Sequence, residues 1–127
     1  MSKESIFLMV AAVGLMPIAL AYGLVPATTV PVLYGVEIDS INLTHVFRAV
    51  MGLYLAMVGF WILGATRESL RFSALCSVVV FMGGLATGRL LSLFIDGVPG
   101  ALLLVYLFLE VGFALVAFKL ARSLQDN

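Results

Sequence analysis

Charged side chains are scarce in this sequence, and that scarcity excludes whole classes of protein. Lysine, arginine, aspartate and glutamate make up only 11% of the 127 residues, while 63% of the residues are apolar. Soluble domains contain about 25% charged residues, so a soluble globular domain is excluded. Basic and acidic residues number seven each, which gives zero net charge. No nucleic-acid partner is expected, because binding to nucleic acid depends on an excess of basic charge.

Cysteine and histidine are almost absent as well. Cys76 is the only cysteine, which excludes an intramolecular disulfide and a CxxC redox pair. His45 is the only histidine, whereas zinc, copper and haem sites usually draw on several His or Cys ligands. We therefore expect no metal. The sequence also contains no recognisable nucleophile–base pair or nucleotide-binding loop, so it does not predict an enzyme.

The apolar residues are numerous enough for four membrane-spanning helices, each of which needs about 20 apolar residues. The sequence predicts an all-α, four-helix transmembrane bundle, formed by a single integral membrane domain over residues 1–127. Short links should make the last three helices antiparallel neighbours. The expected helices cover residues 4–22, 43–66, 72–95 and 100–124.

The longest expected connection is the segment 23–44. It contains Pro26 and Pro31, so we expect an extended chain that lies over one end of the bundle rather than a helix. Ser40 or Asn42 can cap the helix that follows, by accepting a hydrogen bond from a free backbone amide.

Basic residues in the loops and at the termini predict the orientation in the membrane. Five of them fall on the side that holds both termini, and the loops of the other side hold none. Because basic segments stay cytoplasmic, we expect both termini in the cytoplasm. A cleaved signal peptide is a competing interpretation of residues 4–22, but the region before it has no net positive charge. Trp61 is interpreted as a belt or core aromatic, and its place near the cytoplasmic end of its helix suits an anchor in the interfacial belt. The five basic residues are Lys3, Arg67, Arg71, Lys119 and Arg122.

Three ionisable residues fall inside the expected spans, where an unpaired charge costs several kcal/mol. At a rise of about 1.5 Å per residue, Arg48, Arg89 and Glu110 lie roughly 8, 9 and 15 Å below the outer surface. Arg89 and Glu110 are on hairpin neighbours, so we expect them to form a contact. Arg48 is expected in the same cluster, with His45 and Asp96 at its rim.

Small residues predict which helix faces pack closely, because they let another helix approach. They share a helical face with Arg48 or directly precede Arg89, so we expect these faces to bury the charges inside protein. The same residues, together with the short polar loops, predict a homo-oligomer or docking on a larger membrane complex. The small residues are Gly52, Ala56, Gly59, Gly84 and Gly88.

The buried charges allow three interpretations. They can fix helix register only, line a binding pocket, or form part of a proton or ion path. Two arginines and one glutamate carry a formal charge of +1, which favours an anionic or strongly polar head. The protein would then be a non-enzymatic binding or accessory module. Its ligand would be a lipid such as a phospholipid, or a quinone, or a partner helix. The alternative function is an oligomeric small-molecule or ion transporter or channel. Below the charges, the expected apolar cleft is lined by Met82, Leu85, Leu103 and Leu107.

Several short motifs together resemble those of a known family. They are the run from His45 to Tyr54, the Gly88–Ser92 segment, the Asp96–Gly97 turn and Glu110. In these motifs the sequence resembles a numbered bacterial inner-membrane family of unknown function, broadly similar to DoxX-like four-helix membrane proteins. Met51 departs from the pattern, because a second glycine is expected there.

The resemblance implies a multi-pass protein of the bacterial inner membrane, surrounded by membrane lipids, and it carries no established activity. DoxX-like relatives are associated with quinone-linked redox complexes, and the resemblance therefore points toward a quinone.

Overall fold

The computed structural model describes residues 1–126, and these residues form five helices and no strand. Four of the helices, α1, α3, α4 and α5, are long and apolar enough to cross a membrane. The prediction of an all-α fold with four spans is therefore confirmed. The five helices are α1 (Lys3–Gly23), α2 (Pro26–Tyr34), α3 (Ile41–Thr66), α4 (Glu68–Ile95) and α5 (Ala101–Asp126).

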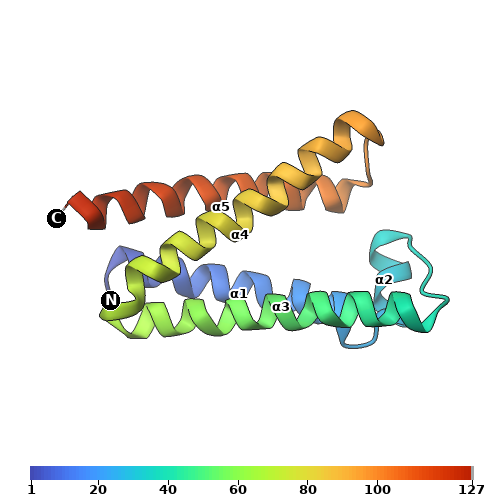
Figure 1. Ribbon diagram of the computed structural model, residues 1–127, viewed down its shortest axis with the longest axis horizontal. Coiled ribbons are helices and arrows are strands. Elements are labelled where there is room, and N and C mark those ends of the chain that lie inside the picture. Colours follow the sequence, from blue (N-terminus) through green and yellow to red (C-terminus); the bar gives the residue numbers. More distant parts are fainter. Residues whose placement is uncertain (127) are drawn as a thin grey trace.

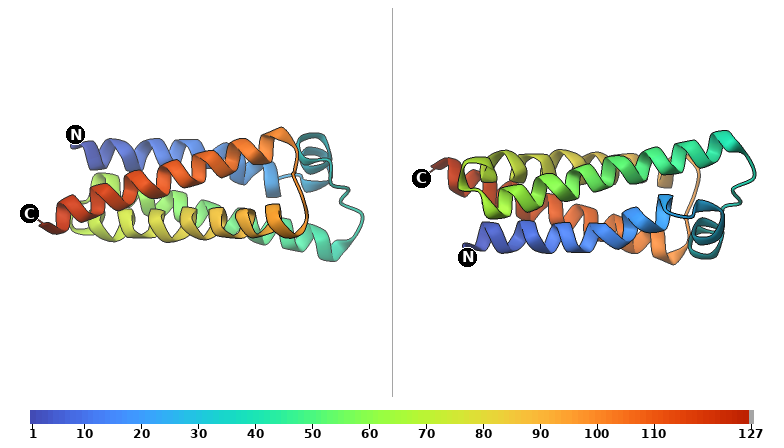
Figure 2. Two further views of the ribbon diagram at one scale, coloured as in Figure 1. Left: turned by 90° about the horizontal axis from the view of Figure 1, so that it is seen from above. Right: turned by 90° about the horizontal axis from the view of Figure 1, so that it is seen from below.

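The long helices are arranged as two pairs. Helix α1 packs along α3, α4 packs along α5, and α3 also contacts α4. In Figure 1 the α4–α5 pair lies above the α1–α3 pair, and α4 is inclined to the other three long helices. Both termini and the α3–α4 turn lie at one end of the bundle, here called the terminal end, and α2 and the α4–α5 loop lie at the other, called the α2 end (Figure 2). The last three helices are antiparallel neighbours, as predicted.

Large apolar side chains fill the core between the two layers. Leu8 of α1, Val58 of α3 and Leu75 of α4 are all less than 2% exposed, with much of the remaining core made of alanine. This part of the core lies toward the terminal end, where the sequence contains few polar residues. Dispersion and close packing, rather than water exclusion alone, hold such an interior together in a membrane.

Trp61 belongs to this core and not to an interfacial belt. Its side chain is 0% exposed, and its indole N–H donates a hydrogen bond of 2.9 Å to the Ser77 hydroxyl of α4. Of the two interpretations of Trp61, the core aromatic is therefore confirmed and the belt anchor is wrong. A buried tryptophan needs a partner for its N–H, and Ser77 supplies that partner inside the bundle.

The turn between α3 and α4 is shorter than the sequence suggests. The expected turn covers residues 66–71, whereas Arg67 alone separates the two helices and Glu68 already begins α4. Arg67 has an extended backbone, with φ −123° and ψ 113°, and this single residue reverses the chain.

Arg71 explains how so short a turn is stabilised. Its Nε donates to the Gly64 carbonyl oxygen at 3.1 Å, and its Nη2 donates to the Ala65 carbonyl oxygen at 3.1 Å. The Ser5 hydroxyl of α1 donates to the same Ala65 oxygen. The last carbonyl groups of a helix have no partner within the helix, so these bonds cap α3 and join α1, α3 and α4 at the terminal end.

The segment expected to be extended contains the short helix α2. Pro26 stands at its first position, where the missing N–H costs nothing. The Thr29 hydroxyl donates to the Ala21 carbonyl oxygen at 2.5 Å, which ties α2 to the end of α1. Gly35 ends the helix with φ +70°, a conformation that favours glycine. The expectation was wrong because Pro31 interrupts only one backbone bond and tertiary contacts compensate for it.

The expected close-packing faces point away from the bundle. All five small residues, Gly52, Ala56, Gly59, Gly84 and Gly88, are exposed, and a Cβ at any of the four glycines would meet no atom within 4 Å. Helices instead approach closely at Gly23, beside Met51, and at Gly64, beside Ala74. The packing prediction is therefore wrong within one chain, and self-association stays a prediction.

Orientation can be tested with single cysteines in a Cys76→Ala background. Substituting cysteine at Glu68 should give a position that an impermeant thiol reagent reaches only after the cells are opened. Cysteines at Asp39 and Asp96, at the α2 end, should react on intact cells. Labelling of position 68 on intact cells would contradict the expected topology, and the Cys76→Ala parent without added cysteine is the control for background.

Candidate functional site

An ion pair joins α4 to α5 in the half of the bundle nearer the α2 end. The Arg89 Nε donates to both carboxylate oxygens of Glu110, at 2.8 Å to Oε1 and 3.1 Å to Oε2. It is the one salt bridge within residues 1–126, with side-chain exposures of 23% for Arg89 and 8% for Glu110. The expected contact between the two residues is confirmed. Pairing is what makes burial of these charges tolerable in a medium of low dielectric constant.

The ion pair uses only part of the arginine. A guanidinium carries five N–H donors, one of them on Nε, and the other four are on the terminal nitrogens. These nitrogens form no hydrogen bond of ordinary geometry with another residue of the described chain, although the Tyr22 hydroxyl lies beside the guanidinium. The Arg89 Cζ also lies 5.7 Å from the centroid of the Tyr106 ring, in a cation–π arrangement.

All four tyrosines of the chain gather beside this pair. The Tyr34 and Tyr106 hydroxyl groups are hydrogen-bonded at 2.8 Å. The Tyr22 ring stacks on Tyr34 with a centroid distance of 5.1 Å and meets the edge of Tyr54 at 5.6 Å. The sequence motifs do not predict this cluster. One signal was present, because Tyr106 precedes Glu110 by four residues and so shares its helical face.

Tyr34 attaches α2 to the long helices. Burial raises the pKa of the Tyr34 hydroxyl above its ordinary value, and the hydrogen bond with Tyr106 raises it further. The hydroxyl therefore stays protonated at physiological pH and keeps its bond to Tyr106. Through this bond, α2 is linked to the residues around Arg89.

An apolar cleft leads to the ion pair. It has a volume of about 70 Å³ and lies between α1 and α5, which otherwise contact each other sparsely. Arg89 and Glu110 are the only charged groups in its wall. Met82 and Leu85 line this cleft as expected, whereas Leu103 and Leu107 do not. The residues on α1 are Ala11, Gly14, Leu15 and Ile18, and those on α5 are Tyr106, Leu109, Glu110 and Phe113.

A second, wider hollow lies on the other side of Arg89. It measures about 220 Å³, and its lining includes Leu103, Leu107 and Asp96. Asp96 accepts a hydrogen bond of 2.6 Å from the Ser92 hydroxyl one helical turn earlier. Asp96 therefore lies at the rim of the Arg89 site, as expected, and it also ends α4.

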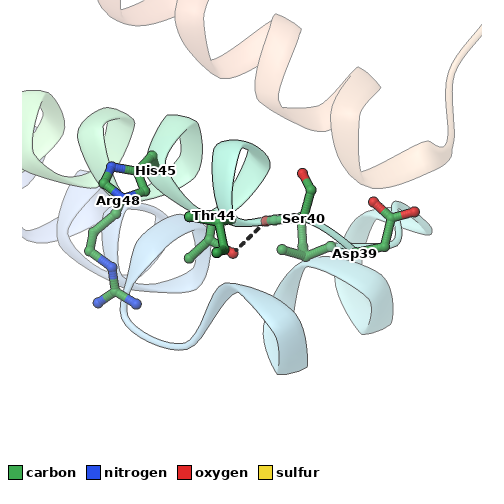
Figure 3. Close-up of a pocket in the computed structure, with 7 residues that line it drawn as sticks. Asp39, Ser40, Thr44, His45 and Arg48 are labelled. Atoms are coloured by element: carbon green, nitrogen blue, oxygen red, sulfur yellow. Dashed lines mark hydrogen bonds between the residues drawn. The ribbon is translucent and has the colours of Figure 1, made fainter.

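Arg48 does not join the cluster, which corrects the expectation. It is exposed, and with His45 it lines an open hollow at the start of α3 that shares no residue with the cleft at Arg89. In Figure 3 the Arg48 guanidinium points away from Asp39, so the polar groups of this hollow do not converge. Ser40 caps α3 there by accepting a hydrogen bond of 3.0 Å from the Leu43 amide. His45 is thus no part of the rim either.

Loss of Arg48 from the cluster changes its charge. One arginine and one glutamate sum to zero, in place of the expected +1. A neutral site gives no general attraction for an anion, so the case for a phosphate head is weaker than the sequence suggests. Among residues 1–126, no three His, Cys, Asp or Glu side chains come together in a way that could hold a metal ion.

A family model described as a domain of unknown function, DUF4345, matches residues 4–121. The chain belongs to the DUF4345 family. The match covers α1 to α4 and most of α5, and it confirms the expected numbered family of unknown function. No curated protein and no solved structure matches the chain. Membership of the DUF4345 family, whose function is unknown, assigns no activity to the chain. The likeness to DoxX-like proteins stays a prediction.

Removing one member of the ion pair should destabilise the protein. Glu110→Gln leaves Arg89 without a counter-charge, which costs about 3–5 kcal/mol in soluble proteins and less in a membrane, where water defects relieve part of the cost. We expect a lower midpoint of thermal unfolding in detergent. The double variant Arg89→Met/Glu110→Leu removes both charges and should recover most of the loss. An unchanged midpoint for Glu110→Gln would contradict a stabilising pair.

Tyr34→Phe should loosen α2 alone. It removes one hydroxyl hydrogen bond, worth about 1 kcal/mol, so amide hydrogen exchange in α2 should accelerate roughly fivefold. Tyr54→Phe is the matched control, because the Tyr54 hydroxyl forms no hydrogen bond within residues 1–126. Equal exchange in both variants would show that the Tyr34–Tyr106 bond does not hold α2.

Proposed function

We propose that this protein is a membrane-embedded binding module, and not an enzyme, that holds an amphipathic molecule from the lipid phase. The molecule would lie in the cleft between α1 and α5 with its polar head at Arg89. The observation that carries the proposal is the composition of the cleft: apolar side chains form most of the wall, and one ion pair and Tyr106 stand in it. Sites for small ligands commonly combine apolar walls with a few converging polar groups.

Access from the lipid phase supports this proposal. Gly14, on the α1 side of the cleft, is exposed, and a Cβ there would meet no atom within 4 Å. Leu109, on the α5 side, is 47% exposed. An apolar chain can therefore approach between the two helices without first crossing an aqueous loop region.

A transporter or channel is less well supported. Between the ion pair and the terminal end, the core contains Leu8, Trp61 and Leu75, whose side chains are fully buried. An ion that crossed this region would pass mainly apolar side chains, and the Ser77 hydroxyl there is already bonded to Trp61. An unpaired charge in such a medium costs several kcal/mol. A binding role needs only the half of the bundle that holds Arg89.

The proposed location is the bacterial inner membrane, with both termini in the cytoplasm. Lys3, Arg67 and Lys119 come from three separate segments, and all three belong to the terminal end. This distribution of basic residues is what the positive-inside rule describes. The α2 end, with Arg89 nearer to it, would then face the periplasm.

Filling the cleft tests the binding function. Gly14→Phe places a large side chain at its mouth, and we expect the variant to retain several-fold less of any co-purifying lipid or quinone, as measured by native mass spectrometry of protein in lipid discs. Gly59→Phe is the matched control, because Gly59 is also an exposed helical glycine with no atom within 4 Å but does not line the cleft. Identical retention in both variants and the parent would exclude the cleft as a binding site.

A further inference from the structure

The charge, the exposed atoms and the volume of the cleft restrict the chemistry of its ligand, and this inference rests on the proposed function. We propose that the cleft takes a lipid-phase molecule with a small, uncharged head that carries a carbonyl oxygen, as in an acyl ester or a ketone. The head would accept hydrogen bonds from the terminal nitrogens of Arg89.

The first argument is charge. Arg89 and Glu110 are the only charged residues that line the cleft, and they neutralise each other at 2.8 Å. A second anion beside the pair would have no counter-charge of its own, and burial of an unpaired charge is strongly unfavourable. An uncharged head does not carry this cost.

The second argument concerns which atoms a ligand can reach. The Glu110 side chain is 8% exposed and both of its oxygens already accept from Nε, whereas Arg89 is 23% exposed and its terminal N–H groups, beside the Tyr22 hydroxyl, are not used by Glu110. The accessible polar atoms are therefore mainly donors. A carbonyl oxygen accepts from such donors, and a hydrogen bond to a charged donor is stronger than one between neutral groups.

The third argument is size and depth. A cavity of about 70 Å³ is about half the volume of the roughly 150 Å³ cavity that holds benzene, so it fits a few heavy atoms and not a ring or a phosphodiester. Because α5 begins at Ala101, Glu110 lies roughly 14 Å along this helix from the α2 end. A charged headgroup stays at the membrane surface, whereas a neutral ester or ketone can enter to this depth.

The test compares photoreactive probes that share one alkyl chain and differ in the head, which is a methyl ester, a sulfate or a plain methyl group. With the protein in lipid discs, the methyl ester should crosslink to the cleft segments of α1 and α5 about tenfold more than either other probe. Gly14→Phe should abolish this crosslinking, and Gly59→Phe should leave it intact.

A shift of the preference toward the charged probe gives a second readout. Glu110→Gln leaves Arg89 as an unpaired cation, so the sulfate probe should gain about tenfold relative to the parent. If this variant does not fold, the comparison of the three probes on the parent protein still tests whether the cleft prefers a neutral carbonyl head.

The outcomes separate the two proposals. Equal crosslinking of all three probes to the parent, blocked by Gly14→Phe, would overturn the neutral carbonyl head and leave the binding function standing. A sulfate preference in the parent would also overturn it. If no probe reaches the cleft segments, both the head chemistry and the proposed function fail.

Discussion

The Arg89–Glu110 ion pair lies in the apolar part of the bundle, and the arrangement of its surroundings depends on it. Neither charge is tolerable there alone, so α4 and α5 are held in the one register that brings the guanidinium to the carboxylate. Tyr106, on the same helix as Glu110, then lies against the guanidinium, and its hydroxyl meets Tyr34 of α2. The position of α2 is thus connected to a charge pair formed by two other helices.

The orientation of the Arg89 guanidinium also decides which of its hydrogen-bond donors remain available to a ligand. Because Nε alone faces the carboxylate, the pair is neutral overall and Glu110 leaves the donors on the terminal nitrogens unused. A guanidinium that met Glu110 through two terminal nitrogens would present fewer of them. The orientation of one side chain therefore separates a purely structural bridge from a site that can also bind.

Much of this fold could be predicted from the sequence, because long apolar segments in a membrane have few alternatives to helices. The Arg89–Glu110 contact could also be predicted, since a five-residue loop forces α4 and α5 to be neighbours. Arg48 could not be placed in the same way. Its helix packs mainly on α1, and the rotation of α3 about its axis is set by Tyr54, Val58 and Trp61, which fill the core. Those large side chains turn Gly52 and Gly59 outward, so the rule that small residues mark contacts failed there.

Helix α2 could not be predicted, because two prolines argue against a helix and the contacts that stabilise it come from distant residues. Thr29 bonds to α1 and Tyr34 bonds to α5. Local propensity in a segment of nine residues is a weak signal, and tertiary contacts outweigh it here.

The two ends of the bundle differ in how many independent bonds must break before they open. At the terminal end, Arg71 and Ser5 fasten three helices through several bonds to the carbonyl groups of Gly64 and Ala65. At the α2 end, the Thr29–Ala21 bond, the Tyr34–Tyr106 bond and one stacked ring hold a helix of only nine residues. Local unfolding begins where the fewest contacts must be lost. We therefore expect the low-energy excited states of this molecule to be those in which α2 detaches while the four long helices remain folded, so that the residues around the ion pair become accessible from the α2 end.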